Sequence, residues 1–139
     1  MPLTNIYIIL IYVHMFIENA VELLGLVSDR TRLEILLLLK RRDFYVCELV
    51  YVLGKSQSLI SHNLRLLRAL GVVTFTKEGK WFRYSLKKDK RFRFLSCLLE
   101  DITLPDEMEK RIDKLKGKDR VGLCKLIKET MEEHNVQGD

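Results

Sequence analysis

The segment SQSLISHNLRLLRALG, residues 56–71, places a leucine-rich stripe beside a polar face that contains no acid. Ile60, Leu64 and Leu67 recur at helical spacing, so they predict the buried side of an amphipathic helix. The second face carries hydroxyl, imidazole and guanidinium groups, from Ser58, Ser61, His62, Arg65 and Arg68. Because such groups bind phosphates and base edges, the segment predicts a helix that lies in the major groove of DNA.

The residues before this helix predict the first half of a helix-turn-helix. YVCELVYVLG, residues 45–54, is a short apolar run that stops at Gly54, and glycine commonly ends helices. Ser56 is then a suitable cap for the polar-faced helix. A short helix, a turn that contains glycine and a polar-faced helix are together typical of this DNA-binding motif.

Two further helices are expected upstream. Residues 16–27 carry apolar side chains at helical spacing and predict an amphipathic helix that buries Leu23 and Leu24. SDRTRLEILLLLKRR, residues 28–42, is nearly all apolar in its middle, with Ser28 or Asp29 as its cap. This second segment therefore predicts a helix that is buried on most of its sides.

The residues after residue 71 predict a β-hairpin. In VVTFTKEGKWFRYSL, residues 72–86, apolar and polar side chains alternate on both sides of a turn at Glu78–Gly79. Lys77 and Lys80 flank the tip, and Arg83 lies on the second strand. A basic hairpin directly after a DNA-reading helix is a wing suited to phosphates or the minor groove. The expected fold is mainly α with a small β-hairpin wing, a winged helix-turn-helix.

Composition and charge agree with this class. The chain has 139 residues, 47% of them hydrophobic, which suits one folded body with an adequate core. Residues 29–93 carry 16 Lys and Arg against 6 Asp and Glu, whereas residues 102–139 carry 8 against 9. A basic body attracts phosphate backbones or anionic membranes. The three cysteines are odd in number and widely spaced, which favours reduced thiols in a cytoplasmic protein.

The N-terminal residues leave two alternatives open. IYIILIYV, residues 6–13, is apolar but too short to span a membrane, and its flanks lack the features of a secretory signal. Residues 1–14 are therefore expected to be an upstream translation artefact or an extension that packs in a dimer interface. No membrane partner is expected.

Three stretches in order, LVSDRTRLEILLLL, YVCELVYVLGKSQSLISHNLRLLRALGVV and KEGKWFRYSL, resemble the ArsR/SmtB family of winged-helix transcriptional regulators. The resemblance covers Leu24 to Leu86. It implies a homodimer that binds a double-stranded DNA operator as a repressor and is released by a metal, metalloid or other signal. It also implies that the helix beginning near Ser56 reads DNA, and that residues 16–27 and 89–101 form the dimer interface. Together with the hairpin cations, the expected DNA contacts are Ser56, Gln57, Ser58, Ser61, His62, Arg65, Arg68, Lys77, Lys80 and Arg83.

The sensing site departs from the family pattern. The arsenical branch carries a Cys-x-Cys pair before Glu-Leu, but DFYVCEL, residues 43–49, has Tyr45 at the first cysteine position and keeps only Cys47. A second family site needs a histidine that residues 87–101 lack. Cys47 and Cys97 remain candidate ligands for a soft metal or metalloid inducer, and no other cofactor is expected. The alternative is that both are inert thiols, which would make the protein a metal-independent regulator.

The tail beyond residue 101 predicts two amphipathic helices that pack on the body or on a dimer mate. Their expected apolar stripes are Met108, Ile112 and Leu115, then Val121, Cys124, Ile127 and Met131. The expected organisation is an extension at 1–14, a DNA-binding and dimerisation domain at 15–101 and a helical extension at 102–139.

Other classes of function fit less well. The chain has no glycine-rich phosphate loop, no metal-binding histidine pair and no nucleophile beside a patterned base, so we do not expect an enzyme. A winged helix used only for protein contact remains an alternative. Binding to duplex RNA is disfavoured, because its major groove is too narrow to admit a helix.

Overall fold

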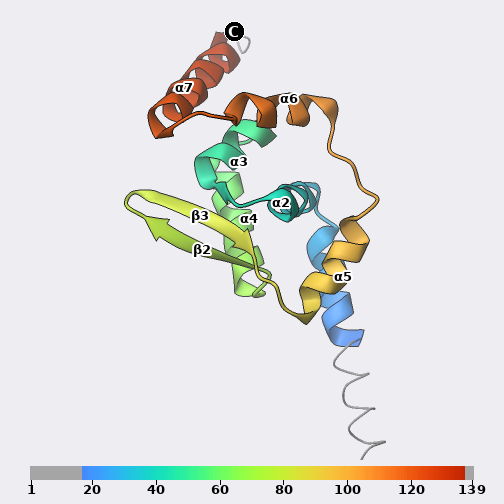
Figure 1. The fold of residues 1–139 in the computed structure, drawn as a ribbon. Helices are drawn as coiled ribbons and strands as arrows, with labels where there is room; N and C mark the ends of the chain where they lie inside the picture. The colour runs from blue at the N-terminus through green and yellow to red at the C-terminus, as the bar shows by residue number, and fades with distance from the viewer. Residues whose placement is uncertain (1–16, 137–139) are drawn as a thin grey trace, which may run out of the picture.

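The computed structural model describes residues 17–136, so the predictions for residues 1–14 lie outside the described residues. Helices dominate, and a small sheet projects from one side (Figure 1). Residues 17–27 are helical. The elements that follow are α2 (Arg30–Arg41), β1 (Phe44–Tyr45), α3 (Val46–Leu53), α4 (Gln57–Ala69), β2 (Val73–Glu78), β3 (Trp81–Leu86), α5 (Lys90–Leu99), α6 (Asp106–Leu115) and α7 (Arg120–Val136). The expected class, a mainly helical winged helix, is confirmed.

The core forms where α2 and α4 meet. Leu36 and Leu38 of α2 are fully buried, as its apolar run predicts. The α4 stripe of Ile60, Leu64 and Leu67 is also fully buried, so this prediction is confirmed. Burial of each such side chain contributes roughly 1.5–3 kcal/mol, which holds α4 with its polar face outward.

Local capping explains where α2 and α4 begin and where α3 ends. The Asp29 carboxylate accepts the N–H of Arg32 at 3.0 Å, and the Ser56 hydroxyl accepts the N–H of Leu59 at 3.2 Å. Gly54 ends α3 at a φ of +61°, in the left-handed region where a side chain would be strained. Because its carboxylate accepts the N–H of Arg32, Asp29 and not Ser28 is the cap of α2.

The wing is a hairpin within a three-stranded antiparallel sheet of order β1-β3-β2. The predicted turn position is wrong by one residue, because Glu78 pairs with Trp81 in the ladder and the turn is Gly79–Lys80. Gly79 adopts a φ of +63°, which explains why the glycine opens the turn. Strand β1, where Phe44 pairs with Tyr84, was not expected from the sequence.

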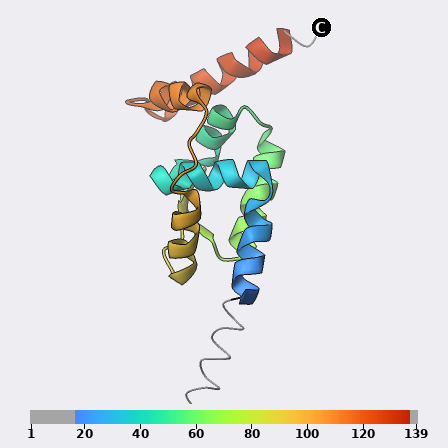
Figure 2. The ribbon, with the colours of Figure 1, turned by 90° about the vertical axis from the view of Figure 1, so that its right-hand side faces the viewer.

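The helices after the wing return to the body. In Figures 1 and 2, α6 and α7 lie at the end of the molecule next to α3, and α5 lies at the opposite end with the helix of residues 17–27. Arg41 of α2 pairs with Glu109 of α6 at 2.7 Å. None of the helices described here combines the length and the apolar character needed to cross a bilayer. The domain boundaries stay a prediction.

Two expected buried residues are exposed. Leu24 is 48% exposed, because the inward side of its helix is formed by Leu23 and Leu26. Val121 is 76% exposed, and Leu123 is buried in its place. In both helices the stripe is shifted, because apolar residues sit on two adjacent faces and only packing selects between them.

Candidate nucleic-acid interface

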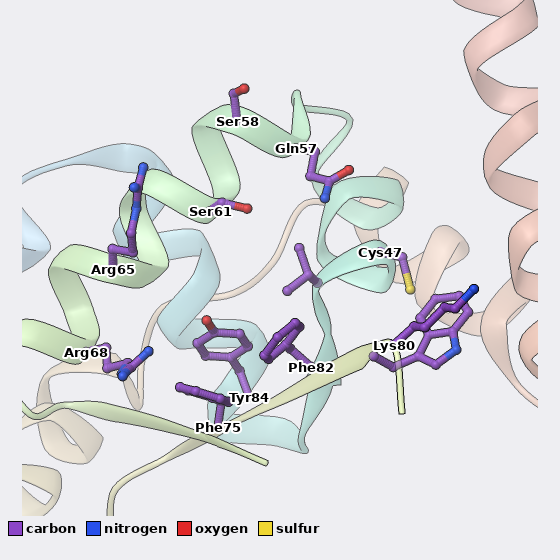
Figure 3. A pocket seen from close by; sticks show the side chains of 12 residues that line it. Cys47, Gln57, Ser58, Ser61, Arg65, Arg68, Phe75, Lys80, Phe82 and Tyr84 are labelled. Carbon is purple, nitrogen blue, oxygen red and sulfur yellow. The ribbon is translucent and has the colours of Figure 1, made fainter. Parts of the chain in front are cut away.

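The polar face of α4 is open to solvent. Gln57 and Ser58 are exposed at its first turn, and His62 and Arg65 are exposed farther along. Ser61 is half-buried, and the Ser56 hydroxyl is used for capping. Figure 3 shows the short side chains of Ser58 and Ser61 on the first half of α4, and the longer side chains of Arg65 and Arg68 farther along the helix, with Arg68 turned toward the rings of the hairpin.

A cavity of about 830 Å³ opens between α3, α4 and the hairpin. Figure 3 shows the rings of Phe75, Phe82 and Tyr84 on the hairpin side, with Arg65 and Arg68 reaching from α4. Within the described residues, no acidic side chain lines this cavity. Its lining consists of Val46, Cys47, Gln57, Ser58, Ser61, Arg65, Arg68, Phe75, Lys80, Trp81, Phe82 and Tyr84. Five of the predicted α4 contacts thus share one concave surface with the wing residue Lys80, namely Gln57, Ser58, Ser61, Arg65 and Arg68. The predicted contacts Ser56, His62, Lys77 and Arg83 do not line it.

The cations of this surface are not neutralised within the part of the chain that the structure describes. There, Arg65, Arg68, Lys77 and Lys80 form no ion pair with an acidic side chain. The guanidinium of Arg68 lies over the Phe75 ring, 4.3 Å from its centre. The ammonium of Lys77 lies 5.9 Å from the centre of the Phe82 ring. Rings hold such cations in place without cancelling their charge.

Arg83 differs from the other predicted contacts. Its guanidinium pairs with Glu78 at 3.0 Å and lies 3.9 Å from the Asp43 carboxylate. Glu78 in turn accepts the Tyr45 hydroxyl at 2.6 Å. This network joins β1 to the hairpin, so the charge of Arg83 is compensated inside the protein. A contact between Arg83 and DNA stays a prediction.

A polar network that was not expected from the sequence positions the turn before α4. Lys55 donates to the Thr31 hydroxyl at 2.7 Å and to the Glu34 carboxylate at 3.0 Å. Glu34 also pairs with Arg30 at 2.8 Å and is only 6% exposed. The available signal was Glu34 itself, the one acid inside the apolar run of residues 33–39, because a buried carboxylate requires a partner.

A second unexpected link joins three helices. Arg32 donates to the Leu26 carbonyl at 2.8 Å and reaches the Asn63 side-chain oxygen at 3.5 Å. The Asn63 amide donates to the Leu59 carbonyl at 2.9 Å, and Asn63 is 4% exposed. Arg32 therefore connects the end of the helix of residues 17–27 to the inner side of α4.

The candidate metal ligands lie on separate elements. Cys47 is half-buried on α3, whereas Cys97 is exposed on α5 at the other end of the molecule (Figure 1). Burial, the charge of Glu48 and, to a smaller extent, Cys124 raise the pKa of the Cys47 thiol to about 11. Among the described residues, no group of three or more cysteine, histidine or carboxylate side chains is arranged to hold a metal. The thiol neighbour that this pKa effect identifies is Cys124 of α7, which was not among the expected ligands.

The fold and this surface define a winged helix-turn-helix regulator. Residues 29–74 match the model of the bacterial regulatory protein family arsR. The chain is 37% identical over 92 residues to an uncharacterised HTH-type transcriptional regulator of Methanocaldococcus jannaschii, a match that covers 66% of this chain and 96% of that protein. The chain belongs to the ArsR family of transcriptional regulators.

Two further similarities agree with this assignment. The arsenical resistance operon repressor of Escherichia coli is 42% identical over 67 residues, which is 48% of this chain and 57% of the repressor. The crystal structure of the transcriptional regulator HlyU from Vibrio vulnificus superposes with a TM-score of 0.58 at 33% identity. That match covers 66% of this chain and 95% of HlyU. The chain thus spans nearly all of HlyU but only a little over half of the repressor.

Proposed function

We propose that the protein is a homodimeric repressor that binds a double-stranded DNA operator through α4 and the hairpin. The observation that carries this proposal is the acid-free face of α4, whose cations Arg65 and Arg68 form no ion pair among the described residues and lie beside the cavity-lining hairpin residue Lys80. Such a face costs electrostatic self-repulsion unless a polyanion offsets it. The repressor role rests on the similarity to the E. coli operon repressor.

In the proposed complex the start of α4 enters the major groove. Gln57, Ser58 and Ser61 meet base edges in this groove. The longer side chains of Arg65 and Arg68 reach the sugar-phosphate backbone of the DNA. Lys77 and Lys80 contact phosphates from the hairpin. Ser56, His62 and Arg83 are secondary members of the proposed contact set.

The proposed domain use follows the fold. Residues 15–101 would form the DNA-binding and dimerisation unit, and residues 102–139 a helical extension, in which α6 and α7 pack on α3. The dimer contact would use the exposed apolar residues of the helix of residues 17–27, together with Leu98 of α5 and Ile102. The proposed location is the cytoplasm, because a bacterial-type regulator must share a compartment with the operator DNA that it binds.

The releasing signal has two candidates. A soft metal or metalloid would need Cys47 as a thiolate, and Cys97 lies on another element. The separation of Cys47 on α3 from Cys97 on α5 supports the alternative of a regulator released by a signal other than a metal.

The DNA proposal is tested by substituting Arg65, an exposed cation on α4. Arg65→Gln should weaken binding of a labelled duplex from upstream of the protein's own operon by about tenfold, because one charged hydrogen bond to phosphate is lost. The slope of the logarithm of the binding constant against the logarithm of salt concentration should become shallower by about one for each Arg65 that contacts a phosphate. Fluorescence anisotropy at several salt concentrations measures both.

Lys110→Gln is the matched control, because it removes one exposed positive charge from α6. It should leave affinity and salt slope unchanged. Equal binding by Arg65→Gln and the unaltered protein, or no binding of any duplex at low salt, would contradict the proposal and favour a winged helix used for protein contact.

A further inference from the structure

The cavity beside α4 has a feature that DNA contact does not explain. Phosphates are bound by charged and hydrogen-bonding groups, and base edges also accept single apolar contacts, yet this cavity contains a cluster of aromatic rings. Phe75 lies 5.4 Å from Phe82 and 5.6 Å from Tyr84, measured between ring centres. Phe82 is still 38% exposed. The structure therefore keeps an apolar ring surface open to solvent at the base of a cationic groove.

The charges around these rings select the sign of a ligand. Arg65, Arg68 and Lys80 line the cavity, and none of its described lining residues is acidic. The Arg68 guanidinium already lies over the Phe75 ring. A flat molecule that packs against the rings would therefore meet a guanidinium at its edge, which suits a planar anion.

The size of the cavity points to an organic molecule. About 830 Å³ is far more than a metal ion or a single phosphate fills, and it lies in the range of about 300–1,000 Å³ typical of small-molecule sites. Hydroxyl and amide groups from Ser58, Ser61 and Gln57 supply the few polar contacts that fix a ligand's orientation.

We propose that this cavity binds a flat aromatic carboxylate, and that the bound ligand displaces DNA by occupying Arg65 and Arg68. The first part of this proposal, ligand binding (the ligand arm), rests only on the cavity. The displacement arm rests on the proposed function, because it requires that the same arginines contact DNA.

The single tryptophan of the chain makes the ligand arm measurable. Trp81 lines the cavity, so the one indole N–H resonance of the ¹⁵N-labelled protein reports on this site. Titration with 2-naphthoate should shift this resonance in a saturable way. The uncharged 2-naphthalenemethanol should bind at least about tenfold more weakly, because it cannot pair with a guanidinium. An unmoved resonance, or equal affinity for both probes, would overturn the proposal.

Variants locate the probe. Phe82→Ala and Arg68→Gln change exposed side chains, so both proteins should keep the native fold, which circular dichroism checks. Each should weaken 2-naphthoate binding by about tenfold, through loss of ring packing or of the charge. Lys110→Gln should bind as the unaltered protein does. Retained affinity in both cavity variants would place the probe elsewhere and overturn the assignment.

Competition tests the displacement arm. Added 2-naphthoate should raise the apparent Kd of the labelled operator duplex linearly with the free concentration of the probe, and should double it at the concentration that half-fills the cavity. A ternary complex with unchanged DNA affinity would overturn direct displacement. If the protein bound no DNA, the indole titration would still report on the cavity, so failure of the proposed function and failure of this inference are distinguishable.

Discussion

At the scale of single residues, burial decides which polar groups react and which only hold the fold. Cys47 and Cys97 are the same residue type, but the first is half-buried on α3 and the second is exposed on α5. Burial raises the pKa of Cys47 to about 11, so its reactive thiolate is scarce at neutral pH. Sequence spacing could not distinguish the two thiols, because the largest cause of the difference is burial, which depends on how the helices pack.

Alkylation with iodoacetamide at pH 8 should therefore modify Cys97 well before Cys47. The raised pKa stabilises the protonated thiol, so the rate at Cys47 should keep increasing with pH up to about 11, beyond the ordinary range for cysteine. Peptide mass spectrometry measures both rates. In guanidinium chloride the two cysteines should react alike, and equally fast labelling in the native protein would contradict the pKa assignment.

The buried carboxylate of Glu34 belongs to the same scale. It accepts from Lys55 and pairs with Arg30, so Glu34→Gln should leave the Lys55 ammonium poorly compensated and lower the free energy of unfolding by about 1–3 kcal/mol. Urea denaturation measures the loss. The control is Glu107→Gln, where the side chain is 66% exposed and the expected change is within about 0.5 kcal/mol.

At the scale of elements, the residues that begin and end helices can be predicted from the sequence, but the pairing between strands cannot. Gly54 and Ser56 mark the two sides of the turn inside the helix-turn-helix, as their residue types predict. The hairpin turn was misplaced by one residue because Glu78 has a ladder partner, Trp81, and fills a network with Tyr45. Strand β1 was missed because two residues carry no periodicity of their own.

Alanine substitutions at two glycines, one in the hairpin turn and one in a helix, should change stability in opposite directions. Gly79 has a φ of +63° and a methyl group there would meet open space, so Gly79→Ala should cost about 1 kcal/mol of stability through backbone strain alone. Gly25 is helical and also faces open space, so Gly25→Ala should add about 0.5–1 kcal/mol. Thermal unfolding compares the two, and equal shifts would contradict the turn assignment.

At the scale of the whole molecule, the helix of residues 17–27 presents an apolar stripe to solvent. Ile17, Val21 and Leu24 recur at helical spacing and are 54%, 64% and 48% exposed. Arg32 links this helix to α4 through the Leu26 carbonyl and Asn63. A dimer formed on this stripe would therefore be linked through Arg32 to α4, the helix proposed to read DNA.

Val21→Glu should convert the proposed dimer to a monomer, because a charge cannot be buried unpaired in an apolar interface. Light scattering coupled to size-exclusion chromatography measures the mass. Val121→Glu is the matched control, since Val121 is 76% exposed on α7 and lies away from this stripe. A dimer that survives Val21→Glu would place the interface elsewhere.

The amino-acid pattern by itself determined the helix-turn-helix, the wing and the acid-free face of α4, because periodicity, capping and local charge are properties of neighbouring residues. The tertiary structure alone decided which apolar face is buried in the helices that hold Leu24 and Val121, and that Arg83 is compensated by Glu78. It also decided that α3, the helix of Cys47, packs against α7, the helix of Cys124. It also decided that α4 and the hairpin enclose a ring-lined cavity. These features depend on contacts between segments far apart in the chain, and local sequence does not encode such contacts.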